Sequence, residues 1–212
     1  MGERHLFLRF EACNIHCDYC DELGKPGFDF DVDSVLQKLI EAEREYGPHS
    51  FVSLTGGEPL LYVSFLKLLL PKLKAHGFRN YLETNGILWK ALDQVIEWTD
   101  VIAMDLKPAS VTKERSFIEE HEIFLTHSLE KETFIKIVCS KDIDLTEFSD
   151  LCRMVSRVER KIPVILQPIS THVEGHEDPE LMRLLGELQT LALGILPDVR
   201  IVPRLHKILK IK

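Results

Sequence analysis

Three cysteines crowd into one short stretch of this 212-residue chain. Cys13, Cys17 and Cys20 follow a C-x3-C-x2-C spacing, whereas the other two cysteines lie far away in the sequence. Thiols at this spacing indicate a metal or iron–sulfur site. Three thiolates hold only three of the four irons of a [4Fe–4S] cube, so the fourth iron keeps a position for a ligand that is not protein. An open coordination position predicts chemistry at the metal.

A zinc-binding module is the alternative interpretation of the same spacing. A structural zinc site closes its tetrahedron with a fourth Cys or His ligand. His16 is the candidate, but it stands next to Cys17 inside the loop, where its ring reaches the same ion poorly. The spacing therefore favours a cluster over zinc.

Composition and charge exclude several classes of function. The chain carries a formal net charge of −8 and 45% hydrophobic residues. An acidic chain offers no accumulated basic patch for nucleic acid or an anionic membrane, so we expect a small-molecule or protein partner. We find neither a signal-peptide pattern nor an apolar stretch of bilayer length, and clustered thiols suit a reducing compartment. We therefore expect a cytoplasmic protein with a single domain over residues 1–212.

Short apolar runs alternate with longer amphipathic ones along the whole chain. This alternation is typical of βα units that build a parallel sheet. Seven strands are fewer than a closed eight-stranded barrel needs, so we predict an α/β fold with a partial, open (β/α) barrel of mainly parallel strands. The predicted strands are 5–11, 50–54, 79–83, 100–105, 132–139, 162–167 and 197–202, and the predicted helices lie near 32–46, 59–76, 87–97, 111–127, 144–159 and 178–192.

Compact polar clusters follow the carboxyl ends of these strands. Because a parallel sheet collects its active site at that edge, the clusters predict one continuous site. The cysteine loop follows the first strand; the later clusters are Thr55-Gly56-Gly57-Glu58-Pro59, Glu83-Thr84-Asn85-Gly86, Asp105-Leu106-Lys107-Pro108, Gln167-Pro168-Ile169-Ser170 and Pro203-Arg204-Leu205-His206-Lys207.

The cysteine loop, followed by Gly-Gly-Glu-Pro after the next strand, resembles the radical S-adenosylmethionine (SAM) superfamily. Within it the chain looks most like the 7-carboxy-7-deazaguanine synthase family of the queuosine pathway. The resemblance implies a [4Fe–4S] cluster on Cys13, Cys17 and Cys20, with SAM chelating the free iron. It covers almost the whole chain, through FLRFEACNIHCDYCD, LTGGEPLL, LETNG, MDLKPAS, ILQPIS and IVPRLHKIL.

The resemblance also implies a reaction. The reduced cluster gives an electron to SAM, and the 5′-deoxyadenosyl radical then drives ring contraction of 6-carboxy-5,6,7,8-tetrahydropterin to 7-carboxy-7-deazaguanine. The resemblance implies a flavodoxin- or ferredoxin-type electron donor, and a homodimer is compatible with it. The competing function is an activating enzyme that abstracts hydrogen from a glycine of a partner protein, since such enzymes share the early motifs.

Residue roles follow from the same resemblance. Arg9 and Thr55 match substrate contacts, and Arg9 suits a clamp on the substrate carboxylate through two parallel hydrogen bonds. The alternative for Arg9 is a strand residue that faces solvent. Lys107 and His206 are further candidates for the reaction. The residues expected to line SAM are Tyr19, Cys20, Asp21, Gly56, Gly57, Glu58, Asp105, Leu106, Lys107, Gln167, Pro168, Ile169 and Ser170.

Two departures from the family concern the substrate site. The synthases carry a Gln-Gly-Glu-Gly stretch before the cysteine loop that touches the pterin, and this sequence contains none, so we expect part of that site to be missing or replaced. Glu22 stands where the family has a threonine that binds Mg²⁺. A carboxylate suits Mg²⁺ equally well, and a solvated loop acid is the equal alternative.

Overall fold

Seven parallel strands form one curved sheet in the computed structural model, which describes residues 3–20, 26–169 and 178–203. The strands pair strictly in sequence order. In the described part of the chain the first and last strands are edges, so the barrel is open and the predicted fold class is confirmed. The strands are β1 (His5–Phe10), β2 (Phe51–Gly56), β3 (Asn80–Thr84), β4 (Val101–Leu106), β5 (Glu132–Cys139), β6 (Val164–Pro168) and β7 (Val199–Ile201).

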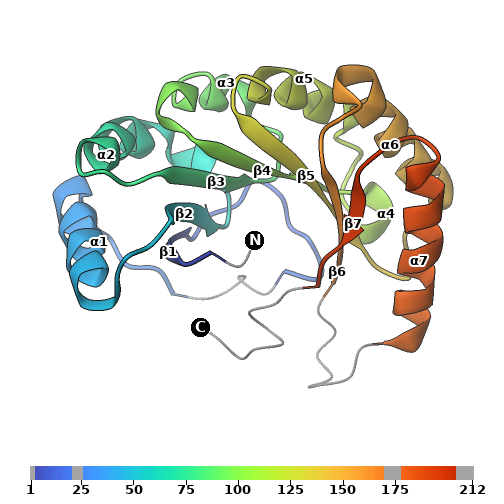
Figure 1. Ribbon diagram of the computed structural model, residues 1–212, viewed down its shortest axis with the longest axis horizontal. Helices are drawn as coiled ribbons and strands as arrows, with labels where there is room; N and C mark the ends of the chain where they lie inside the picture. Colours follow the sequence, from blue (N-terminus) through green and yellow to red (C-terminus); the bar gives the residue numbers. More distant parts are fainter. Residues whose placement is uncertain (1–2, 21–25, 170–177, 204–212) are drawn as a thin grey trace.

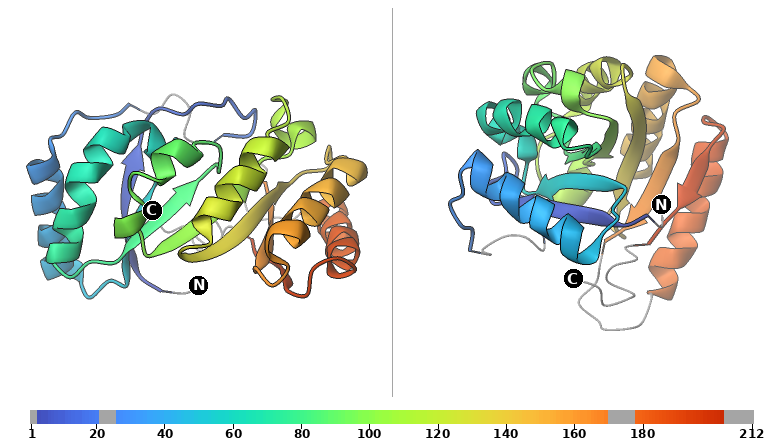
Figure 2. Two further views of the ribbon diagram at one scale, coloured as in Figure 1. Left: turned by 90° about the horizontal axis from the view of Figure 1, so that it is seen from above. Right: turned by 60° about the vertical axis from the view of Figure 1, so that its left-hand side comes forward.

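Helices lie along the outer, convex side of this sheet (Figures 1 and 2). Three of the long ones begin after an aspartate, since Asp31, Asp144 and Asp178 each accept a hydrogen bond from a backbone N–H of the first turn. The α-helices are α1 (Val32–Tyr46), α2 (Val63–Ala75), α3 (Trp89–Leu92), α4 (Ala109–Thr112), α5 (Ile118–Ser128), α6 (Leu145–Glu159) and α7 (Pro179–Leu193), and two 3₁₀ turns are η1 (Pro59–Tyr62) and η2 (Ile96–Trp98).

Two predicted helices are wrong in extent. The stretch 87–97 forms only the single turn α3 and then tighter turns into η2, where the adjacent β-branched residues Val95 and Ile96 disfavour a regular α-helix. The stretch 111–127 divides into α4 and α5. Lys113 takes the left-handed conformation, with φ 65°, and so ends α4 after one turn. The chain after Lys113 then runs toward the cysteine loop.

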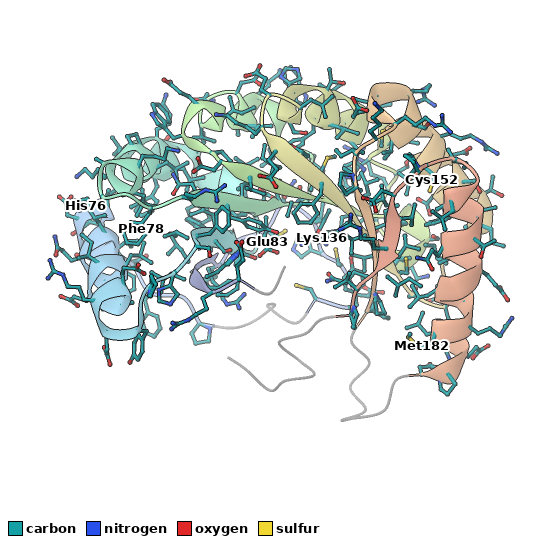
Figure 3. The ribbon with its side chains drawn as sticks, in the orientation of Figure 1. His76, Phe78, Glu83, Lys136, Cys152 and Met182 are labelled. Carbon is teal, nitrogen blue, oxygen red and sulfur yellow. The ribbon has the colours of Figure 1, made fainter. Side chains whose placement is uncertain are left out.

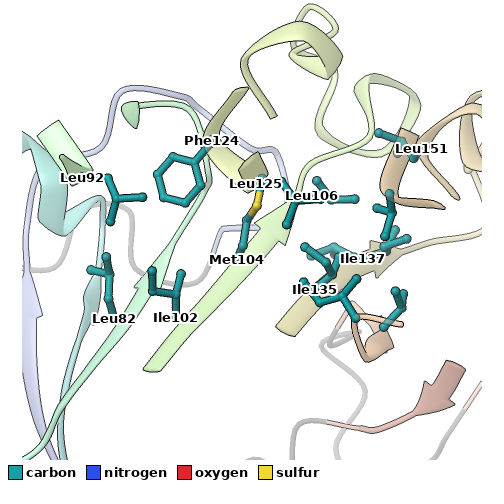
Figure 4. Packing of buried hydrophobic residues seen from close by; sticks show 14 of the residues in the cluster. Leu82, Leu92, Ile102, Met104, Leu106, Phe124, Leu125, Ile135, Ile137 and Leu151 are labelled. Carbon is teal, nitrogen blue, oxygen red and sulfur yellow. The ribbon is translucent and has the colours of Figure 1, made fainter. Parts of the chain in front are cut away.

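The helix-facing side of the sheet forms the hydrophobic core. Successive strand residues alternate between the two faces, and Leu82, Ile102 and Met104 pack outward against α3 and α5. Figure 4 shows these side chains together with Leu92 and Phe124. This core fixes the sheet, and through it the strand ends. None of the described helices has the length and apolar content that a membrane crossing requires.

The inner face of the sheet carries polar side chains. Paired residues of parallel neighbours point to the same side of a sheet, and the register sets Arg9 beside Thr55 and Asp105 beside Lys136. Figure 3 shows Glu83 and Lys136 on this concave side. Charged groups from the central strands therefore face the interior of the open barrel.

The core predicts that two leucines of α2 contribute very differently to the free energy of unfolding. Leu70 is fully buried, whereas Leu68 is 62% exposed. We expect Leu70→Ala to lower the free energy of unfolding by about 2–5 kcal/mol, and Leu68→Ala to change it by about 0.5 kcal/mol or less. Urea unfolding followed by circular dichroism measures both. Similar losses in the two variants would contradict the assignment of α2 faces.

Candidate active site

The Gly-Gly-Glu turn after β2 holds the chain that enters the cysteine loop. The Gly57 N–H donates to the Phe10 carbonyl at 2.6 Å, and the Glu58 N–H donates to the Ala12 carbonyl at 2.8 Å. A Cβ on Gly57 would lie 2.1 Å from the Ala12 oxygen, so only glycine permits this approach. Gly56 has φ +103°, and a Cβ added there would lie 2.4 Å from the Phe10 oxygen. The glycines are thus required by backbone packing, and their contact with SAM stays a prediction.

The cysteine loop packs around its own thiols. Cys17 is 7% exposed and lies in a small apolar cluster with Ile15 and Phe117, against which Cys13 and Cys20 also pack. Burial raises the pKa of both the Cys13 and Cys17 thiols. Thiolates at this place therefore need positive charge from a bound metal group.

The loop is also held from outside. The His16 N–H donates to Glu114 Oε1 at 2.7 Å, in the segment that follows Lys113. Among the described residues no set of three His, Cys, Asp or Glu side chains is close enough to ligate one ion. A cube differs from a single ion because each thiolate binds a different iron. The thiols of Cys13, Cys17 and Cys20 lie in one loop, as cluster binding requires.

Glu58 joins two strand ends. Its side chain is fully buried, and its two oxygens accept hydrogen bonds from the Leu60 N–H, the Thr84 hydroxyl and the Asn85 N–H at 2.8–3.0 Å. Burial raises its pKa to about 7, although these donors oppose the rise. Because the protein supplies these donors, Glu58 acts here by positioning the turn, and its direct contact with SAM stays a prediction.

Asn85 connects the third strand end to the cysteine loop. Its Nδ2 donates to Asn14 Oδ1 at 2.7 Å and lies 3.9 Å from Cys13 Sγ. The Asn85 carbonyl lies 3.0 Å from Nε2 of His121 on α5. Burial lowers the pKa of His121 to about 4, so its ring is neutral and donates this bond. A helix of the outer layer thereby supports the loop.

Four charged side chains form a network on β3, β4 and β5 and the loop after β4. Lys107 Nζ lies 2.9 Å from one Asp105 oxygen, and Lys136 Nζ lies 2.9 Å from the other. Lys136 also lies 3.0 Å from Glu83 Oε2. Burial works to raise the pKa of Asp105, but the two lysines hold it well below its usual range. Asp105 therefore stays ionised between two cations.

Lys107 links this network to the cysteine loop. Its ammonium lies 5.7 Å from the centre of the Tyr19 ring, within the range of a cation–π contact. The Tyr19 hydroxyl is buried beside Cys17 and makes no hydrogen bond to an oxygen or nitrogen among the described residues. Burial raises the pKa of Tyr19. A buried hydroxyl of this kind fits a site that a further group completes.

The remaining predicted residues divide between the two faces. The Arg9 guanidinium stacks 5.2 Å from the Phe7 ring centre on β1. Leu106 is fully buried in the helix-side core, so only its backbone can face SAM. Gln167, Pro168 and Ile169 lie at the end of β6, where the Ile169 N–H donates to the Cys139 carbonyl. The predictions for Asp21, Glu22, Ser170 and His206 fall outside the described residues.

Comparison with known proteins decides the family. A sequence profile of the Radical SAM superfamily matches residues 8–130. The chain belongs to the radical SAM superfamily. It is 34% identical to 7-carboxy-7-deazaguanine synthase of Geobacter sulfurreducens over 98% of this chain and 90% of the relative. Identity to the synthase of Methanopyrus kandleri is 29%, over 98% and 86%. The chain is therefore a radical SAM lyase similar to 7-carboxy-7-deazaguanine synthase.

Two solved structures share the fold. The SAM-bound structure of Streptococcus suis SuiB matches with a TM-score of 0.70 and 16% identity, over 95% of this chain and 50% of SuiB. A radical SAM methyltransferase from Sphaerobacter thermophilus matches with a TM-score of 0.65 and 12% identity, over 94% and 65%. This radical SAM chain thus spans half of the first structure and about two thirds of the second.

The cofactors of the superfamily fit the residues present. Three thiols share one loop, and the buried Tyr19 hydroxyl beside Cys17 has no oxygen or nitrogen partner among the described residues. We therefore expect Cys13, Cys17 and Cys20 to hold the cluster of this radical SAM enzyme.

The sequence analysis placed Glu83 and Asn85 in a strand-end cluster without giving either residue a role, and it missed Lys136 and His121 as parts of the site. For Lys136 a signal was available, since a lysine in the middle of the apolar run TFIKIV must face away from the core. Glu83 likewise alternates with Leu82. His121 gave no comparable signal, because its contact with Asn85 joins residues 36 positions apart.

Gly57 offers a direct test of the cysteine-loop packing. The added Cβ in Gly57→Ala must displace the Ala12 backbone, so we expect this variant to lose most of its iron after anaerobic reconstitution and on the order of 2 kcal/mol of stability. Gly186 on α7 is the control, because a Cβ there meets nothing within 4 Å. We expect Gly186→Ala to gain about 0.5–1 kcal/mol and to keep its iron. Equal iron in both variants would refute the packing argument.

His121 predicts a pH dependence of stability in the cluster-free protein. Its pKa is about 4 when folded and 6.5 in the reference state, so the unfolded chain binds more protons between these values. Stability due to a neutral His121 is present above pH 6.5 and is lost as pH falls toward 4, by on the order of 2–3 kcal/mol. Glu58, whose pKa burial raises to about 7, contributes the opposite trend in this window, and it does so equally in every variant. Urea unfolding of His121→Gln should therefore lose less stability than wild type as pH falls from 6.5 to 4. The exposed His76→Gln should keep the wild-type pH dependence, and parallel curves for all three proteins would contradict the prediction.

Proposed function

We propose that the chain is a radical SAM enzyme with a [4Fe–4S] cluster that converts 6-carboxy-5,6,7,8-tetrahydropterin to 7-carboxy-7-deazaguanine. The observation that carries the proposal is its 34% identity, over nearly the full length of both chains, to a relative with this product in its name. The cysteine loop and the charged inner face support it independently. The reaction is a radical ring contraction with loss of ammonia.

The cysteine loop would hold the cofactors. Cys13, Cys17 and Cys20 would each ligate one iron, and SAM would complete the fourth. When bound, the cluster and SAM supply the 5′-deoxyadenosyl radical that removes hydrogen from the substrate. The chain's own part is to keep the loop in place through Gly57, Glu58 and Asn85, and to exclude water around the thiols with Ile15 and Phe117.

Charge on the inner face supports the choice of substrate. The carboxylate of the pterin fits a guanidinium, and Arg9 lies at the carboxyl half of β1, beside Thr55. The ring N–H groups of a pterin need acceptors, and the Glu83 carboxylate faces the same interior with 27% of its side chain exposed. The Asp105–Lys107 pair, next to Tyr19, is suited to a zwitterion such as SAM.

Further parts of the assignment stay predictions. These are the flavodoxin- or ferredoxin-type electron donor, Mg²⁺ bound near Glu22, a cytoplasmic location and a homodimer. None of them rests on the contacts of the described residues.

The proposal predicts the behaviour of two cysteine variants. With the pterin, reduced and reconstituted enzyme should release 7-carboxy-7-deazaguanine, and without the pterin it should cleave SAM to 5′-deoxyadenosine; mass spectrometry detects both products. Substrate and deazapurine differ only by ammonia, so the hydrogen atom that the radical removes is returned and SAM is not consumed in turnover. Cys17→Ala should lose the cluster and both products, because one iron loses its protein ligand. Cys152→Ala is the matched control, since Cys152 is buried in the helix-side core and acts as a small apolar residue.

Two outcomes would count against the proposal. Deoxyadenosine formation without the deazapurine would reject the substrate, and a glycyl radical formed on an added partner protein would favour the activating-enzyme alternative. Zinc in place of iron and sulfide, in protein purified without oxygen, would reject the radical chemistry as a whole.

A further inference from the structure

A buried lysine in the middle of β5 joins two acidic side chains on the inner face. The Lys136 side chain is 12% exposed, and its ammonium lies 3.0 Å from Glu83 on β3 and 2.9 Å from Asp105 on β4. Figure 3 shows Glu83 and Lys136 next to each other on the concave side of the sheet. One ammonium thus bridges three adjacent strands.

The two acids depend on Lys136 to different degrees. Asp105 has a second cation, because Lys107 lies 2.9 Å from its other oxygen. In the described part of the chain, Lys136 is the cation that pairs with Glu83. Loss of Lys136 would therefore leave Asp105 paired and would release Glu83.

The network lies above an aromatic floor formed by His5, Phe51, Tyr81 and Phe134 on the same face. The Tyr81 ring centre lies 5.1–6.2 Å from the other three rings, and burial raises the pKa of its hydroxyl. Little water surrounds the ammonium from this side, so its ion pairs are strong and the cost of breaking one is high. A buried charge pair is weak evidence for stability, but it fixes side-chain orientation well.

We propose that Lys136 is a positioning residue for the substrate. It holds the Glu83 carboxylate in the orientation in which the carboxylate accepts hydrogen bonds from the pterin ring. This inference rests on the function proposed above. Lys136 itself does not touch the reacting atoms. Its effect on the substrate passes through Glu83, whereas its effect on SAM is small because Lys107 still holds Asp105.

The test measures binding and turnover separately in reconstituted holoenzyme. Two affinities are measured: the affinity for SAM, and the affinity for 6-carboxy-5,6,7,8-tetrahydropterin with SAM present and no reductant. The proteins compared are wild type, Lys136→Met, Lys136→Arg, Glu83→Gln and the double variant Lys136→Met/Glu83→Gln. We expect Lys136→Met to weaken pterin binding about tenfold or more, and SAM binding by about threefold at most. The double variant should bind pterin as Glu83→Gln does, because Lys136 acts through that residue. Lys136→Arg keeps the charge and should recover part of the affinity.

A second lysine–carboxylate pair provides the control. Lys74 lies 2.6 Å from Asp100 at the amino end of the sheet, away from the site. Lys74→Met should leave both affinities and kcat/KM unchanged, and thermal unfolding shows whether each variant is folded.

Two results would overturn the inference. One is an additive loss of pterin affinity in the double variant, and the other is a loss of SAM affinity in Lys136→Met as large as the loss for pterin. Failure of the proposed function looks different, because wild type itself would then form no deazapurine. If wild type binds the pterin without converting it, the ratios of binding constants still decide the role of Lys136. If wild type does not bind the pterin, the inference fails together with the proposed function.

Discussion

The site depends on one buried carboxylate. Glu58 accepts hydrogen bonds from the turn after β2 and from the turn after β3, and so it fixes the distance between two strand ends. The cysteine loop is attached to both of these turns. The Gly57 and Glu58 N–H groups hold the chain that enters the cysteine loop, and Asn85 holds Asn14 within it. An unpaired carboxylate at this depth would be costly, so the turns and Glu58 stabilise one another.

The inner face balances its charges in pairs. Asp105 and Glu83 are acidic, Lys107 and Lys136 are basic, and each lies within about 3 Å of an opposite charge. Such a network is neutral as a whole while it presents oriented dipoles to the interior. Oriented dipoles suit a site for zwitterionic and polar ligands, because little reorganisation is needed when the ligand arrives.

The sequence predicted the strands well, because short apolar runs alternate with longer amphipathic stretches along the whole chain. It predicted the position of the cysteine loop and of the turns after β2, β3 and β4 for the same reason. The division of 111–127 was missed because it depends on the backbone of Lys113 and on Glu114 reaching His16. Leu106 was expected beside SAM from its place in a motif, yet strand alternation turns its side chain into the core. Motif membership locates a residue along the chain, and alternation decides which way it points.

The strictly sequential order of the sheet has a consequence for how the molecule opens and folds. Each strand pairs only with its neighbours in the chain, as in a repeat protein, so no pairing has to bring together distant parts of the sequence. Local unfolding in such an array starts at the ends. The charged network lies on β3, β4 and β5, the three central strands, and is therefore the part of the inner face that fraying reaches last.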